Sequence, residues 1–125
     1  MPLCLNSLVL VSCFVAIAPA MAAEDAGTKL FKNHCGACHS IDPASTPRQG
    51  PNLFDVMHRK AGALEGFKYS PGLKAADWQW SSEKLDLWLT DAKAVVPDTL
   101  MSVYKQKDPE KRKLIIDFLI ANSKK

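Results

Sequence analysis

Cys35-Gly36-Ala37-Cys38-His39 is the stretch around which the rest of the chain is arranged. The pattern C-x-x-C-H is the attachment signature of c-type haem. Two thiols one helical turn apart can add to the two vinyl groups on one edge of a porphyrin, and the next residue can offer an imidazole nitrogen to the iron. The stretch therefore predicts one covalently bound haem c, with thioether bonds to Cys35 and Cys38 and with His39 as the proximal iron ligand.

Cysteines at this spacing also occur in zinc sites and in redox-active dithiols. A structural zinc site needs four ligands, usually in two pairs, but no cysteine follows Cys38, and the only other histidines are His34 and His58. A thioredoxin-like dithiol needs a surrounding βαβ pattern, which the sequence does not display. A five-letter motif with two free positions is only moderately specific, so a chance match stays open at this point.

Residues 1–22 have the pattern of a secretory signal peptide. An apolar run over residues 8–18 is broken only by Ser12, and Ala20-Met21-Ala22 fits the small-residue rule for cleavage. Cleavage after Ala22 would leave one domain, residues 23–125, of roughly 100 residues. Because thioether-linked haem is normally assembled on the far side of a bacterial membrane, we expect this domain in the periplasm.

Two alternatives to a cleaved signal stay open. They have to be considered because the residues before the apolar run lack the Lys or Arg that most signal peptides carry there. An uncleaved segment would anchor the protein in the membrane, although such a span needs about 20 apolar residues. Leu10-Val11-Ser12-Cys13 loosely matches a lipoprotein-processing site, but the apolar run continues beyond it.

The overall charge is mildly positive. The chain holds 16 Lys and Arg against 13 Asp and Glu, a formal net charge of +3. This balance is too mild to indicate a nucleic-acid partner.

Apolar residues recur with helical rather than alternating spacing, which predicts an all-α chain of about four to five short helices and long loops. The expected helix starts are Asp25, Ser70, Ser81 and Asp108, each a capping residue. The helix from Ser70 is expected to end at Ala76, and residues 40–51 and 91–104 are expected to be irregular. Long loops in so short a chain need something else to fill the interior. A haem would do this, so we expect the haem-free chain to be largely unfolded.

Beyond the motif, the residues resemble a known family, the class I cytochromes c, over essentially the whole chain after Gly27. The family places a prolyl carbonyl twelve residues after the haem histidine, and Pro51 stands twelve residues after His39. It places a methionine ligand about sixty residues after that histidine, and Met101 stands 62 residues after it. The resemblance implies that the Pro51 carbonyl accepts the Nδ1 proton of His39, and that Met101 is the distal iron ligand.

The resemblance also implies roles for further side chains around the haem. Arg59, Tyr69 and Trp80 match positions that contact the haem propionates, and Thr99 matches a position near one of them. Trp88 matches an aromatic residue, often tyrosine, that lies against the haem near the methionine sulfur. The crossing of the first and last helices is expected to involve Gly27, Phe31, Ile115 and Phe118.

The chain departs from the family pattern near the methionine. Asp98 and Leu100 stand where the family usually has glycine and lysine. Trp88 in place of tyrosine is expected to lose a hydroxyl that could bond the Met101 sulfur. Met57 is another methionine to consider, and His58 replaces a usual glycine. We expect His58 to be a surface or propionate-side residue and His34 to be solvated at the surface.

A six-coordinate iron has no open position for a substrate, so the resemblance implies a one-electron carrier and not an enzyme. We expect a monomer that binds no nucleic acid and has no small-molecule substrate. Its expected partners are redox proteins: a membrane oxidoreductase complex, an oxidase or a periplasmic dehydrogenase. One alternative is a subunit permanently bound to an oxidoreductase. Another is a haem sensor with a labile sixth ligand.

Overall fold

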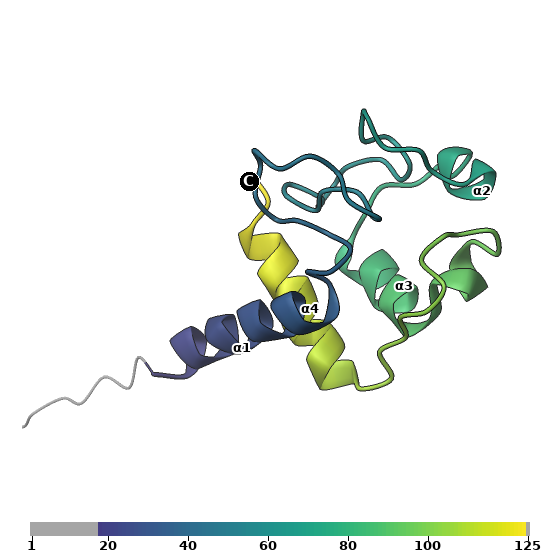
Figure 1. Ribbon diagram of the computed structural model, residues 1–125. Helices are drawn as coiled ribbons and strands as arrows, with labels where there is room; N and C mark the ends of the chain where they lie inside the picture. The colour runs from purple at the N-terminus through teal and green to yellow at the C-terminus, as the bar shows by residue number, and fades with distance from the viewer. Residues whose placement is uncertain (1–17, 125) are drawn as a thin grey trace, which may run out of the picture.

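The computed structural model describes the backbone of residues 18–124 and the side chains from Ala26 onward. Figure 1 shows the first and last helices crossing on one side of the molecule, the two middle helices on the other, and long loops between them. In chain order the helices are α1 (Ala18–His34), α2 (Pro71–Lys74), α3 (Ser82–Val95) and α4 (Pro109–Ala121). This arrangement confirms the predicted all-α fold.

Extended pairing is confined to one antiparallel bridge, between Lys60 and Gln79, in the part of the chain that the structure describes. None of the helices there has both the length and the apolar content needed to cross a membrane. The residues that precede Ala18, which hold most of the predicted signal, lie outside the described part.

Three helices begin at the capping residues that the sequence predicts. The side-chain oxygen of each cap accepts a hydrogen bond from a backbone N–H of the first turn, which has no partner within the helix. The pairs are Ser70 with Leu73 at 3.3 Å, Ser81 with Lys84 at 3.2 Å and Asp108 with Glu110 at 2.9 Å. The end predicted for α2 is wrong by two residues, because the helix stops at Lys74.

The predicted start of α1 is also wrong. The helix begins at Ala18, so Asp25 lies within it instead of capping it. The residues from Ala18 to Asp25 are mostly alanine and methionine, which have high helix propensity. Pro19 stands in the first turn, where proline is tolerated. Nothing in that stretch therefore ends the helix before Asp25, and the predicted cleavage position after Ala22 falls inside α1.

The helix α3 continues through a residue predicted to be irregular. Asp91 has φ −162° and ψ 96°, so the helix is kinked there and then runs on to Val95. The Asp91 carboxylate accepts a hydrogen bond of 2.6 Å from Lys105 Nζ. An extended residue with a short acidic side chain is what a helix N-cap uses, so Asp91 can restart the helix after interrupting it.

The crossing of α1 and α4 is confirmed with its predicted residues. A Cβ at Gly27 would lie 2.7 Å from the backbone oxygen of Leu114, so glycine lets the two backbones approach. The rings of Phe31 and Phe118 meet with centroids 4.9 Å apart. Ile115 is 1% exposed and is among the most buried side chains described.

Three tryptophans connect α3 to the segment before it. Trp78 and Trp80 meet edge to face at 4.7 Å between ring centroids, and Trp80 meets Trp88 in the same way at 5.2 Å. Edge-to-face contact is a favoured geometry for aromatic pairs. This packing fixes Trp88 on the face of α3 that looks toward the loop carrying Met101.

Candidate haem site

The Cys35–His39 stretch continues from the end of α1 as tight turns. Cys35 N–H donates to the Phe31 carbonyl at 2.8 Å, and His39 N–H donates to the Cys35 carbonyl at 2.8 Å. These turns place the two cysteines and the histidine close together. Arg48 Nη1 donates to the Gly36 carbonyl at 2.7 Å, which gives a carbonyl just beyond the end of α1 a hydrogen-bond partner.

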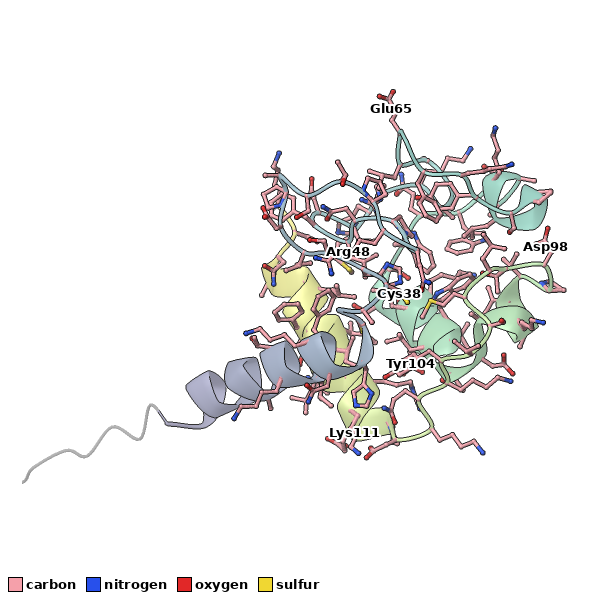
Figure 2. All side chains as sticks on the ribbon, in the orientation of Figure 1. Cys38, Arg48, Glu65, Asp98, Tyr104 and Lys111 are labelled. Carbon is pink, nitrogen blue, oxygen red and sulfur yellow. The ribbon has the colours of Figure 1, made fainter. Side chains whose placement is uncertain are left out.

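The two cysteines differ in environment, and both are free thiols. Cys35 is buried, and burial together with the charge of Cys38 raises the pKa of its thiol to about 11. Cys38, labelled in Figure 2, is partly exposed, and its Sγ donates to Gln49 Oε1 at 3.1 Å. Cys35 is therefore a neutral thiol inside the fold, and Cys38 reaches toward the surface.

The imidazole of His39 is oriented by its neighbours. Its Nδ1 lies 2.7 Å from the Pro51 carbonyl oxygen, which can only accept, so Nδ1 carries the proton. Burial lowers the pKa of His39, the hydrogen bond to Pro51 opposes this, and the charge of Arg59 adds to it. The ring is therefore neutral, with the lone pair on Nε2 free for a metal.

Gly50 allows the chain to pass close to this ring. A Cβ at position 50 would lie 2.6 Å from His39 Nδ1, which is far inside van der Waals contact. The Gly50 N–H donates to the Cys38 carbonyl at 2.8 Å, so this backbone also braces the attachment turn. Gly50 was not among the predicted site residues, although a glycine before the key proline was a signal for such a close approach.

Met101 lies beside Trp88. The indole Nε1–H of Trp88 donates to Met101 Sδ at 3.1 Å. The hydroxyl expected to be lost with tryptophan at this position is therefore replaced by the indole N–H, which gives the sulfur a hydrogen-bond donor. The sulfur is partly buried against the core and keeps a second lone pair.

The residues expected near the propionates make hydrogen bonds and ring contacts within the protein. Arg59 donates to the carbonyl of Asn52 at 2.9 Å and to that of Phe54 at 3.4 Å, and burial lowers its pKa. Because a guanidinium has five N–H donors, some remain for an anion. Tyr69 meets Phe67 edge to face at 4.8 Å, and burial raises the pKa of its phenol.

Trp80 and Thr99 are both buried. Trp80 also holds the backbone beside Arg59, since its N–H donates to the Arg59 carbonyl at 2.9 Å. Thr99 Oγ1 accepts from the Met101 N–H at 3.3 Å, which shapes the turn before the methionine. Trp80 through its backbone N–H and Thr99 through its hydroxyl therefore each support a neighbouring residue of the candidate site.

Asn52 is a further site residue that was not predicted from the sequence. It is buried, and its Nδ2 donates to the carbonyls of Asp42 at 2.7 Å and Ser45 at 3.0 Å. Its Oδ1 accepts from the Phe54 N–H at 2.8 Å. These bonds hold the loop after His39, and an asparagine directly after Gly50-Pro51 was the available signal.

The remaining histidines and the other methionine lie elsewhere. His58 is exposed with φ 65°, in the left-handed region that favours glycine, and His34 is exposed. Both agree with the expected surface positions. Met57 packs against the core, and its N–H donates to Ser123 Oγ at 3.2 Å, near the end of the chain.

The donor set fits a haem c and not a zinc ion. Among the side chains that the structure describes, residues 26–124, no three His, Cys, Asp or Glu gather closely enough to hold a metal ion. The attachment turn presents two thiols one turn apart and an imidazole with a free Nε2, which is what covalent haem attachment requires.

Comparison with known proteins decides the family. The family model described as Cytochrome c matches residues 24–121. The chain belongs to the cytochrome c family. It is 39% identical over 104 residues to a cytochrome c2 of Rhodomicrobium vannielii, covering 82% of each chain. It is 34% identical over 94 residues to a cytochrome c of Ginkgo biloba, covering 75% of this chain and 83% of the relative.

A third relative is longer than this chain. The c-type cytochrome cy of Rhodobacter capsulatus is 37% identical over 108 residues, which cover 85% of this chain and 53% of the relative. As a cytochrome c, the protein is an electron-transfer protein and not an enzyme, and it works with protein redox partners. Its cofactor is covalently bound haem c, consistent with Cys35, Cys38 and His39 as the binding motif.

Proposed function

We propose that the protein is a periplasmic one-electron carrier with one haem c, whose iron is bound by His39 Nε2 and Met101 Sδ. The observation that carries this proposal is the hydrogen bond from Trp88 Nε1 to Met101 Sδ at 3.1 Å. It occupies one sulfur lone pair and leaves the other for a metal. On the opposite ligand, the 2.7 Å contact of His39 Nδ1 with Pro51 leaves Nε2 free in the same way.

Two neutral axial ligands suit electron transfer. When bound, the haem iron supplies a one-electron couple between its ferrous and ferric forms. A thioether favours the ferrous form and raises the reduction potential. The buried tryptophans and the short hydrogen bonds hold both ligands in place, so little has to move when the charge changes.

The propionates of the haem would be held by Arg59, Tyr69, Trp80 and Thr99. Arg59 contributes a positive charge, and the phenol and the indole contribute O–H and N–H donors. Burying a carboxylate is costly unless it is paired and hydrogen-bonded. The partial burial of Arg59 and Tyr69 and the burial of Trp80 and Thr99 support the proposal that they supply that pairing.

Export of the protein is part of the same proposal. We propose that residues 1–22 are a signal peptide and that residues 23–125 form the single, monomeric domain in the periplasm. The apolar run and the Ala20-Met21-Ala22 site support this. Mass spectrometry of protein recovered from a bacterial periplasm tests it, since an uncleaved or lipid-bearing chain would contradict it.

Optical spectroscopy tests the iron ligands. The purified ferric protein should show a weak red charge-transfer band, which reports sulfur bound to low-spin iron. Met101→Ala should abolish that band, while Met57→Ala should leave it. A high-spin spectrum, or a band that survives Met101→Ala, would overturn the assignment of Met101.

A second candidate function is a subunit held by an oxidoreductase, and exposed apolar residues favour it. Leu100 is 70% exposed and Val103 is 95% exposed, on both sides of Met101. An apolar contact would depend little on salt, whereas electrostatically steered transient encounters slow steeply as ionic strength rises. Electron-transfer rates measured across a salt series with a membrane oxidoreductase, an oxidase or a dehydrogenase separate the two.

A haem sensor with a labile sixth ligand is the remaining alternative. It requires Met101 to leave the iron, which the hydrogen bond from Trp88 opposes. Carbon monoxide binding to the reduced native protein would support the sensor.

A further inference from the structure

Asp98 joins the loop that carries Met101 to the start of α2. Its Oδ2 accepts from the Gly72 N–H at 2.8 Å, and its Oδ1 accepts from Ser70 Oγ at 3.2 Å. Ser70 Oγ in turn accepts from the Leu73 N–H at 3.3 Å. Figure 2 shows Asp98 at the tip of its loop, on the side that faces α2. One carboxylate therefore bonds both the N-cap of α2 and a free N–H of its first turn.

Glycine at position 72 makes this approach possible. A Cβ there would overlap the carboxylate of Asp98 and would also come within 3.1 Å of Val96 Cγ1. Gly72 lies in the first turn of the four-residue helix α2, and glycine has a lower helix propensity than alanine. The helix thus carries an unfavourable residue at the position where the methionine loop touches it.

The other end of the loop is fastened to α3. Lys105 Nζ lies 2.6 Å from Asp91 Oδ2, and the Gln106 N–H donates to the Leu89 carbonyl at 2.7 Å. Within the loop, the Met101 N–H is bonded to Thr99. The loop is therefore held between two elements, with the contacts of Asp98 on the α2 side.

We propose that Asp98 is a positioning residue that keeps the Met101 sulfur on the iron by fastening the loop to α2. The proposal rests on the proposed function, because it takes Met101 as the distal ligand. Asp98 stands three residues before Met101, where the family that the sequence resembles usually has glycine, which has no side chain for such contacts. Opening the loop requires both hydrogen bonds to a charged acceptor to break, and bonds of this kind are stronger than neutral ones.

Imidazole binding to the ferric protein measures how often the loop opens. Added imidazole can take the sixth position only when Met101 leaves, so its apparent affinity is scaled by the fraction of open loop. We expect Asp98→Ala to raise that affinity about tenfold, which corresponds to about 1.4 kcal/mol. Asp98→Asn, which keeps an acceptor for the Gly72 N–H, should give a smaller increase.

Gly72→Ala provides a second route to the same contact, because its methyl group displaces the carboxylate without altering it. It should raise imidazole affinity as Asp98→Ala does, and the double variant should add little to either single change. Asp117→Ala is the matched control. It removes an exposed carboxylate of α4 that pairs with Lys113 at 2.6 Å, far along the chain from the loop.

The outcomes separate this proposal from the proposed function. A red band in the unmodified protein, with raised imidazole affinity in the Asp98 and Gly72 variants but not in Asp117→Ala, supports the positioning role. A red band with unchanged affinity in Asp98→Ala and Gly72→Ala overturns the role of Asp98 alone. Absence of the band from the unmodified protein overturns both.

Discussion

A single hydrogen bond at each candidate axial ligand determines which lone pair is left free to bind the iron. The carbonyl of Pro51 fixes the protonated nitrogen of His39, and the indole of Trp88 occupies one lone pair of Met101. Neither partner carries a charge. Small changes at these residues therefore act on the electron density of the ligand and leave the net charge of the site unchanged.

Replacing Trp88 with phenylalanine keeps the aromatic ring and removes the bond to the sulfur. The indole N–H draws electron density from the sulfur, so its loss makes the sulfur a better donor to ferric iron. A hydrogen bond of about 1 kcal/mol corresponds to roughly 40 mV for a one-electron couple. We expect the reduction potential to fall by about 20–40 mV, as measured by redox titration.

Trp78→Phe is the control for this change. Trp78 packs edge to face on Trp80 and lies under Lys84 at 4.7 Å, away from the sulfur bond. Its substitution should leave the potential within experimental error. An equal fall in both variants would indicate a general loosening of the tryptophan packing.

At the scale of elements, the α1–α4 crossing depends on the absence of one side chain. Gly27→Ala would gain about 1 kcal/mol of helix propensity, but its Cβ would press on the Leu114 carbonyl. Overpacking of this kind costs about 1–3 kcal/mol. We expect a net loss of about 1 kcal/mol in the free energy of unfolding, measured by denaturant titration. A variant with a higher free energy of unfolding would contradict this, because it would show that α1 and α4 can move apart enough to accommodate the methyl group without losing stability.

The kink of α3 provides a pH-dependent contact. The hydrogen bond from Lys105 lowers the pKa of Asp91 below its ordinary 3.8; burial opposes this shift, and the charge of Lys105 adds to it. A carboxyl with a lowered folded-state pKa stabilises the fold above its unfolded pKa and loses this contribution as the pH falls through the lowered value.

We therefore expect the native protein to lose the stability that the Asp91–Lys105 contact contributes only below about pH 4. Asp91→Asn should flatten the dependence of Tm on pH in that range and leave its shape unchanged near neutrality. Asp77→Asn is the control, since Asp77 is 99% exposed and lies 3.7 Å from Lys60. An equal flattening in both variants would contradict a specific contribution of Asp91.

Across the whole molecule, much of the chain between the helices is irregular, as Figure 1 shows. Hydrogen bonds from Asn52 to the Asp42 carbonyl and from Arg59 to the Asn52 carbonyl hold part of it. A chain this short buries too little surface to compensate for the entropy of long loops. The haem is therefore expected to complete the core.

Without haem, the chain should lose its cooperative fold. A Cys35→Ala/Cys38→Ala variant, which cannot form the thioether bonds, should show weak helical circular dichroism and no sharp thermal transition after extraction of haem. The haem-loaded protein should unfold cooperatively under the same conditions. A sharp transition in the haem-free variant would show that the helices alone are sufficient for folding.

The sequence by itself determined the haem motif, the helical class and the starts of three helices. These depend on neighbouring residues: Cys35 and Cys38 are one turn apart, and Ser70, Ser81 and Asp108 each cap the turn that follows. Local hydrogen bonding decides such features wherever the chain lies. Spacing to Pro51 and Met101 added candidate ligands through the family resemblance.

Only the tertiary structure decided which groups meet across the site. The indole of Trp88 reaches Met101 and the carboxylate of Asp98 reaches Gly72 because folding brings distant segments together. The early start of α1 and the continuation of α3 beyond Asp91 to Val95 also escaped prediction, since a capping residue does not reveal whether a helix has already begun before it. Local patterns specify a helix start, whereas donors and acceptors far apart in sequence find one another only when packing fixes the loops between them.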